Sequence, residues 1–98
     1  MKDFIERLNK AFENRVRLGI MSSLMVNDKI DFNTLKEMLD LSDGNLASHI
    51  SALEKAGYVK VEKKFMGKKP NTVYHVSAVG RKAFLQHLDA LEELIKKK

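Results

Sequence analysis

Residues 42–56 contain a set of small polar side chains that could form hydrogen bonds to another molecule. The set comprises Asn45, Ser48, His49 and Ser51, on one side of a helical pattern whose other side is apolar. An asparagine amide can pair with the edge of adenine, and a serine hydroxyl can bind a base edge or a phosphate. This set therefore predicts a DNA contact, and the alternative is an ordinary solvent-exposed helix face.

Two residues of this stretch have competing structural roles. His49 borders the apolar side formed by Leu46, Ile50 and Leu53. A half-buried structural histidine is therefore the alternative to a DNA contact at His49. Asp43 is expected to cap the helix rather than to contact DNA, because phosphates would repel its carboxylate.

Lysines are concentrated in a later segment of the chain. Residues 1–56 carry eight Lys and Arg against nine Asp and Glu, whereas residues 57–98 carry ten against four. One ten-residue window holds five lysines, which are Lys60, Lys63, Lys64, Lys68 and Lys69, with Glu62 as its only acid. Charge localised in this way is typical of a protein with a polyanionic partner. The alternative is a solvated hairpin.

Lys68 and Lys69 are the best candidates for contacts with phosphates or with the minor groove. Lys63 and Lys64 alternate in side-chain direction along a strand, so at most one of them can face DNA, and Lys64 is the one in the predicted set. Arg17 joins the set as a backbone contact. Arg15 could make the same kind of contact, and ion pairs within the chain are the alternative for both arginines.

The sequence predicts neither catalysis nor metal binding. His49, His75 and His87 are scattered, without the spacing of a catalytic triad or a zinc-protease motif. Cysteine is absent, and His87 with Asp89 and Glu92 is one imidazole short of a zinc site. We therefore expect no enzymatic activity, no metal and no cofactor.

Apolar spacing predicts a helix-rich first half. The expected elements are helices over 1–12, from 13 or 14 to 25, from 33 or 34 to 39 and over 42–56, with a short strand over 29–32. The first two helices could be one bent helix. The tight connection between the last two predicts a helix-turn-helix. Asn33 or Thr34 is expected to cap the third helix and Ser42 the fourth, which Gly57 ends.

The second half changes to a β pattern. Strands over 58–65 and 73–76 flank a turn over 66–72 that contains Pro70, and Ser77 is expected to cap a final helix. The predicted fold class is therefore α+β, mainly α. The element order is that of a winged helix-turn-helix, with a small antiparallel sheet, a hairpin wing and a helix at each terminus.

Composition narrows the class of protein further. The chain of 98 residues is 44% hydrophobic and 32% charged, which is typical of one globular domain, here residues 1–98. The sequence holds no apolar run long enough to cross a membrane and no signal-peptide pattern. With the lack of cysteine, these features favour a cytoplasmic protein.

Both terminal helices carry apolar faces that a small domain does not need for its own core. The faces consist of Phe4, Ile5, Leu8 and Phe12 in the first helix and of Leu85, Leu88, Leu91 and Ile95 in the last. If exposed, they would form a patch that a two-fold homodimer would bury. Segments 1–13 and 84–98 are therefore predicted to be dimerisation helices. The alternative is that they pack on each other within one chain.

Three motifs resemble those of one family of regulators. They are Leu46-x-x-His49-Ile50-x-x-Leu53-x-x-x-Gly57, Gly67-Lys68-Lys69-Pro70-x-Thr72-x-Tyr74 and Ser77-x-x-Gly80-Arg81-x-Ala83-Phe84. With them, residues 14–88 resemble the compact winged-helix regulators related to the multiple-antibiotic-resistance (MarR) and arsenical-resistance (ArsR) repressors of bacteria and archaea. The resemblance implies a homodimeric, DNA-binding transcriptional regulator. Helix 42–56 would enter the major groove, and the basic wing over 63–72 would lie on the backbone or in the minor groove.

The chain departs from this family at two positions. Arginine or lysine often stands where Ser48 and Ser51 lie, and those cations read guanine best. The expected function is that of a repressor in a bacterium or archaeon, with modest base reading by the helix and an effector left open. The alternative is a winged-helix protein-interaction module without sequence-specific DNA binding.

Overall fold

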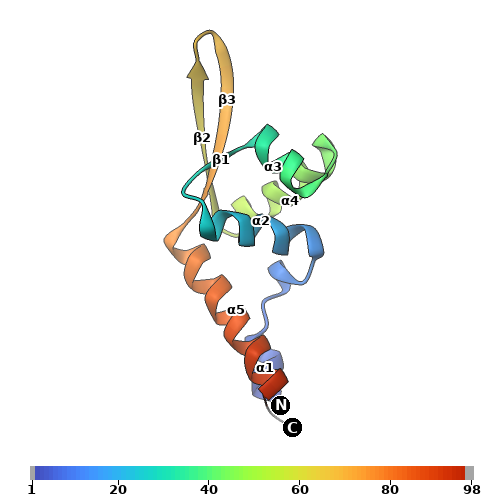
Figure 1. Ribbon diagram of the computed structural model, residues 1–98. Helices are drawn as coiled ribbons and strands as arrows, with labels where there is room; N and C mark the ends of the chain where they lie inside the picture. The colour runs from blue at the N-terminus through green and yellow to red at the C-terminus, as the bar shows by residue number, and fades with distance from the viewer. Residues whose placement is uncertain (1, 97–98) are drawn as a thin grey trace.

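The computed structural model describes the backbone of residues 2–96 and the side chains of residues 5–96 (Figure 1). The elements in chain order are α1 (Lys2–Arg7), a 3-10 turn η1 (Lys10–Phe12), α2 (Arg15–Val26), β1 (Ile30–Asp31), α3 (Phe32–Leu39), α4 (Asp43–Lys55), β2 (Val59–Met66), β3 (Lys69–Val76) and α5 (Ala78–Lys96). The predicted winged helix-turn-helix class is confirmed. The side chain of Phe4, one of the predicted dimerisation residues, lies outside the described part.

Two asparagines divide the N-terminal segment into separate helices. The side chain of Asn9 accepts a hydrogen bond from the backbone N–H of Ala11 at 2.9 Å and caps η1. The side chain of Asn14 accepts from Val16 and Arg17, at 2.9 and 3.1 Å, and caps α2. Each cap pairs donors that a helix start leaves without partners. The first two predicted helices are therefore separate rather than one bent helix. The continuous helix predicted over 1–12 is wrong, because it ends at Arg7 and η1 follows as a separate turn.

Helices α3 and α4 form the predicted helix-turn-helix. The cap of α3 is Asp31, whose carboxylate accepts from the backbone N–H of Thr34 at 2.7 Å, so the predicted cap at Asn33 or Thr34 is wrong. A carboxylate is favoured there by the helix dipole as well as by the hydrogen bond. After α3, Asp40 adopts a left-handed φ of 53°, which turns the chain toward α4. Ser42 caps α4 as predicted, whereas Asp43, also expected to cap this helix, is its first residue.

The sheet is small and antiparallel, with the strand order β1-β3-β2. Strand β1 pairs with β3 at Val73 and Tyr74, whereas β2 and β3 pair along all 8 residues of each strand. The distal part of the hairpin is therefore a two-stranded ribbon. Figure 1 shows this ribbon projecting away from the helices, as the predicted wing.

The turn at the end of the wing is tighter than the sequence predicts. The predicted turn over 66–72 is wrong, because only Gly67 and Lys68 lie between the two strands. Gly67 has a φ of +67°, which two-residue hairpin turns favour. Pro70 is tolerated within β3 because β1 pairs only farther along that strand, so the ribbon has a free edge beside it.

The start of α5 is locked to the base of the wing. The Oγ of Ser77 accepts a hydrogen bond from the Gly80 N–H at 2.8 Å, as predicted for a cap, and donates one to the Gly57 carbonyl at 2.6 Å. Gly80 lies so close to the chain before β2 that a Cβ there would be 2.1 Å from the Tyr58 carbonyl oxygen. This crossing of α5 and β2 therefore requires a glycine.

The core forms where the helices meet the base of the sheet. Its fully buried large side chains are Phe12, Ile20, Met21, Leu24, Leu35, Leu46, Ile50 and Leu53. The assignment of Phe12 to the dimerisation face is wrong. Its ring centroid lies 5.1 Å from that of Phe84, edge-on, and 5.2 Å from that of Tyr58, so the side chain is enclosed by its own chain.

The molecule is elongated, with principal extents of 56 × 25 × 21 Å and a radius of gyration of 14.8 Å. A compact domain of this length would have a radius of gyration of about 13 Å. Figure 1 shows the wing projecting at one end and α1 packed beside the far part of α5 at the other. None of the helices within residues 2–96 combines the length and the apolar character of a membrane span.

Candidate nucleic-acid interface

Helix α4 presents the predicted polar set in two ways. Asn45, Ser48 and Ser51 are exposed, whereas His49 is half-buried. The apolar face of the same helix is buried in the core, which fixes the direction in which the polar face points. Three short, neutral side chains thus form a low surface that a nucleic-acid groove can approach closely.

Arg17 and His49, both in the predicted set, are brought together by α2 and α4. The Nε–H of Arg17 donates a hydrogen bond to Nδ1 of His49 over 3.1 Å. An Nδ1 that accepts carries no proton, so the imidazole is in the Nε2–H form. His49 therefore lies in a half-buried structural position, which the sequence allowed as the alternative to a DNA contact. The bond uses one of the five guanidinium donors of Arg17.

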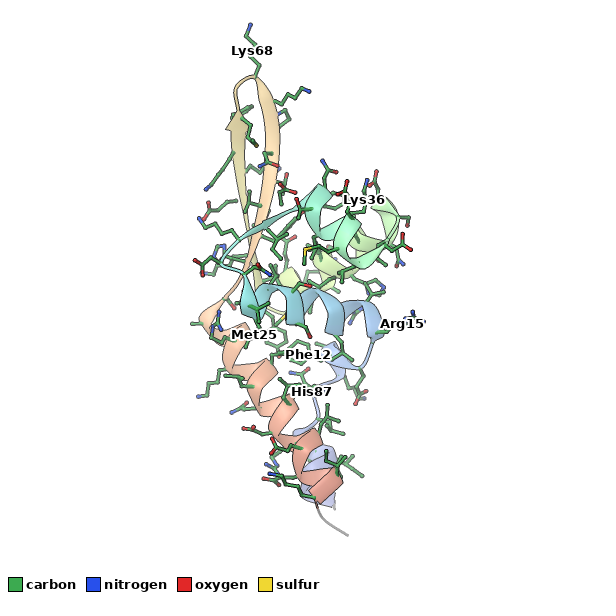
Figure 2. The ribbon with its side chains drawn as sticks, in the orientation of Figure 1. Phe12, Arg15, Met25, Lys36, Lys68 and His87 are labelled. Carbon is green, nitrogen blue, oxygen red and sulfur yellow. The ribbon has the colours of Figure 1, made fainter. Side chains whose placement is uncertain are left out.

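A cation that sequence reasoning missed lies at the start of α4. The Nζ of Lys36, labelled on α3 in Figure 2, is 2.7 Å from Oδ1 of Asp43. Asp43 lies in the first turn of α4, whose cap is Ser42, so the carboxylate is also favoured by the helix dipole. Lys36 offsets the negative charge that would repel phosphates at this helix end. No sequence motif pairs these two residues, because the bend between α3 and α4 brings them together.

Arg15 lies near the same end of α4. It lines an open hollow of about 570 Å³ between α2 and the connection from α3 to α4, with Asn45 on the opposite side. Figure 2 shows the Arg15 side chain projecting outward from the start of α2. An exposed arginine in this position is a further candidate for a phosphate contact.

The wing lysines divide between the two faces of the ribbon, because side chains alternate along a strand. Lys63 shares its face of the ribbon with Val59 and Val61. Val59 is buried, and Val61 lies directly across from Tyr74, so the Tyr74 side chain is on this face as well. The ring of Tyr74 lies 6.4 Å from that of Phe32 in α3. Lys63 is therefore on the face of the wing that turns toward the helices.

Lys64 lies on the other face and belongs to an ion-pair network. Its Nζ is 3.4 Å from Glu62, which also accepts a hydrogen bond from Lys29 at 2.9 Å. The hydrogen bond from Lys29 lowers the pKa of Glu62, and the same bond raises the pKa of Lys29. Lys64 is thus partly engaged within the chain, and this geometry favours Lys63 over Lys64 as the strand lysine for a phosphate.

The two remaining predicted lysines lie at the end of the wing. Lys68 is in the turn and extends from the tip in Figure 2. Lys69 begins β3 directly across from Met66, on the face that carries Lys64. The wing therefore carries cations on both faces and at its tip, on the part of the molecule farthest from the terminal helices.

The predicted dimerisation residues other than Phe12 and Phe4 have mixed surroundings. A stripe along α5 is 40% to 84% exposed and consists of Leu85, Leu88, Leu91 and Ile95. Ile5 is exposed and Leu8 is half-buried. Helix α1 packs beside α5 in the same chain, where Arg7 pairs with Glu93. The intramolecular packing that the sequence allowed is thus present, but it leaves the α5 stripe on the surface.

Comparison with known proteins identifies the family of this chain. Residues 16–95 match the model of the winged helix DNA-binding domain family. Since this match spans most of the chain, the protein belongs to that family. A protein of Methanocaldococcus jannaschii described as uncharacterized is 34% identical over 87 residues, which cover 89% of this chain and 95% of that protein.

Solved structures of regulators share the fold. A transcriptional regulator homologue from Pyrococcus horikoshii OT3 is 35% identical, with a TM-score of 0.88 over 98% of this chain and 96% of that chain. An ArsR family transcriptional regulator, at 15% identity and a TM-score of 0.64, covers 100% of this chain and 96% of its own, and shows the shared fold alone. The resemblance to compact winged-helix regulators is confirmed, and a family of DNA-binding regulators argues against an enzymatic role.

Proposed function

We propose that the protein is a homodimeric, DNA-binding transcriptional regulator that acts as a repressor. Helix α4 enters the major groove of duplex DNA, and the basic wing follows the backbone into the adjacent minor groove. The bound dimer blocks access of the transcription machinery to its site. This function places the protein in the cytoplasm of a bacterial or archaeal cell, where the DNA is.

One observation carries the proposal: cations, all exposed except the half-buried Lys36, flank the exposed polar face of α4 without covering it. Lys36 and Arg15 lie beside the start of that helix, and Lys63 and Lys68 lie on the wing. Cations in this arrangement can bind the phosphates on either side of a groove while the small polar side chains reach the base edges. The absence of charge at Ser48 and Ser51 leaves much of the affinity to the phosphate contacts.

Dimerisation is supported by the apolar stripe on α5. Its leucines stay exposed even though α1 packs on the same helix. A contiguous apolar surface at the end of the molecule opposite the wing suits a two-fold contact. Such a dimer would present two copies of α4 to successive major grooves, about 34 Å apart. In this proposal residues 1–98 act as one domain, with the terminal helices as the dimer contact.

A mobility-shift assay over a salt series tests DNA binding. The probe is duplex DNA from upstream of the gene that encodes this chain. We expect a shift at low salt that weakens steeply as salt rises, because binding releases counterions from the phosphates. A complete lack of shift at low salt would contradict the proposal. It would favour the second candidate, a protein-interaction module, which the uncharged Ser48 and Ser51 support.

A further inference from the structure

Two large apolar side chains lie at the end of the wing, where the chain has no core to bury them. Phe65 and Met66 are the last residues of β2 and are 74% and 68% exposed. Within residues 2–96, the ribbon at this distance from β1 consists of two strands alone. Neither side chain is therefore explained by packing within the chain.

The two side chains lie on opposite faces of the ribbon. Met66 receives a hydrogen bond at its sulfur from the side-chain amide of Asn71, at 3.4 Å, on the face away from the helices. Phe65 lies directly across from Pro70 and shares its face with Lys63. This is the face whose inner part packs toward α3. The exposed ring is thus on the side of the wing that turns toward the helices.

The charge around Phe65 determines what can cover it. Lys63 lies on its face and Lys68 lies in the turn next to it, so the apolar ring has cations beside it, whereas Lys69 is on the opposite face. Burial against an apolar protein surface would bring these cations into a poorly hydrated contact. Duplex DNA suits the arrangement better, because it offers phosphates to the lysines and stacked base edges to the ring.

The length of the wing decides which groove its tip would meet. Beyond its pairing with β1 the ribbon has four residues in each strand, which extend about 13 Å. This length is close to the major-groove width of about 12 Å, so with α4 in the major groove the tip would lie at the bordering phosphate strand, beside the next minor groove.

We propose that Phe65 is a minor-groove wedge, an inference that rests on the proposed DNA-binding function. The ring inserts its edge against a base step while the neighbouring lysines bind the phosphates on both sides. Wedges of this kind unstack a step partly and bend the duplex toward the major groove. Insertion costs least at flexible pyrimidine–purine steps, so Phe65 supplies sequence preference through DNA deformability. This preference would compensate for the uncharged reading face of α4.

The test uses Phe65→Ala, Phe65→Leu and Met66→Ala with the upstream duplex, labelled at both ends for energy transfer. We expect Phe65→Ala to bind the duplex about tenfold more weakly and to lose the bend. Phe65→Leu retains an apolar wedge, so it should keep most of the affinity and most of the bend. Because no charge is removed, the salt slope of Phe65→Ala should equal that of the wild type. Met66→Ala, on the opposite face, should bind and bend the duplex like the wild type.

Groove identity is tested by replacing guanine with inosine at the steps that the wing covers. This change removes the amino group from the minor groove and leaves the major-groove edge intact. We expect tighter binding of the wild type but not of Phe65→Ala. Thermal unfolding should be the same for both proteins, since the ring is exposed.

Each outcome has a distinct meaning. If the wild type binds the duplex and Phe65→Ala binds and bends it equally well, the wedge is wrong and the proposed function stands. If Phe65→Ala changes the mass of the protein in solution but not its DNA affinity, Phe65 is a contact between two copies, which also overturns the wedge. If the wild type binds no duplex, the proposed function fails and the wedge fails with it.

Discussion

The Nε–H of Arg17 donates a hydrogen bond to Nδ1 of His49 over 3.1 Å, and this bond ties α2 to the helix that carries the polar face. Both residues could contact DNA when considered separately. Together they set the position of α4 from its half-buried side. The orientation of Asn45, Ser48 and Ser51 depends on this contact as well as on the buried apolar face.

Replacing His49 by alanine should therefore loosen α4. A hydrogen bond of this type contributes about 1 kcal/mol, which corresponds to a melting temperature lower by roughly 4–8 °C for a domain of this size. His49→Asn keeps an acceptor near the position of Nδ1 and should lose less. Thermal unfolding followed by circular dichroism measures the difference. Identical melting temperatures of His49→Ala and the wild type would show that this hydrogen bond does not stabilise the position of α4.

A different histidine, His87, makes the folding stability depend on pH. His87 is 3% exposed, and its Nδ1 accepts a hydrogen bond from the backbone N–H of Asn9 at 3.0 Å. Burial lowers the pKa of His87, while the carboxylate of Glu13 opposes this shift. The unfolded chain therefore binds the proton more readily than the folded chain. The contribution of His87 is fully present above its unfolded pKa, about 6.5, and is lost as pH falls toward the folded pKa.

We expect the free energy of unfolding to decrease between pH 7.5 and pH 5 and the arm formed by α1 and η1 to loosen first. His87→Asn keeps an acceptor for Asn9 and removes the titrating ring, so its unfolding free energy should vary less over this range. Urea titrations at several pH values measure both proteins. If the wild type and His87→Asn showed the same pH dependence, groups other than His87 would be responsible for it.

The crossing of α5 over the start of β2 should tolerate no side chain at Gly80. A Cβ there would lie 2.1 Å from the Tyr58 carbonyl oxygen, and a backbone atom cannot move aside cheaply. Gly80→Ala should therefore destabilise the protein by about 2–3 kcal/mol. Gly44→Ala is the matched control, because no atom of the residues that the structure describes lies within 4 Å of its Cβ position in α4. Alanine at that helical site should stabilise by about 0.5–1 kcal/mol. Equal melting temperatures for the two variants would contradict the close approach.

The α5 stripe should hold the dimer together. Leu88→Glu places a charge within the stripe and should convert the dimer to a monomer, because an interface cannot bury an unpaired carboxylate cheaply. Gln86→Glu adds the same charge two residues away, on a different side of the helix, and should leave the dimer intact. Light scattering after size-exclusion chromatography gives the mass. A wild type that is already monomeric would refute this interface.

Local patterns in the sequence predicted the elements well where one signal dominated. The apolar spacing of Leu46, Ile50 and Leu53 and the cap at Ser42 were enough to place α4. The wing turn was harder to predict, because a proline usually marks the end of a strand, whereas Pro70 lies within β3. Only the strand pairing reveals that the ribbon has a free edge beside it.

The local sequence does not determine whether an apolar side chain is covered by its own chain or by a partner. Phe12 has the spacing of an amphipathic helix face, but the breaks at Asn9 and Asn14 turn it into the core. The same limit applies to Lys63 and Lys64. Alternation showed that they face opposite ways, and only the packing of Tyr74 against Phe32 reveals which face turns toward the helices.

The salt dependence of DNA binding for a wing variant is the most direct test of the central claim. The variant Lys68→Ala/Lys69→Ala removes two charges at the wing tip, and Lys10→Ala/Lys82→Ala removes two exposed charges from η1 and α5. Fluorescence anisotropy with the upstream duplex gives the slope of log affinity against log salt. We expect the wing variant to bind more weakly and to lose about two units of slope, one for each phosphate contact, while the control keeps the wild-type slope. A wing variant with wild-type affinity and slope would contradict the account.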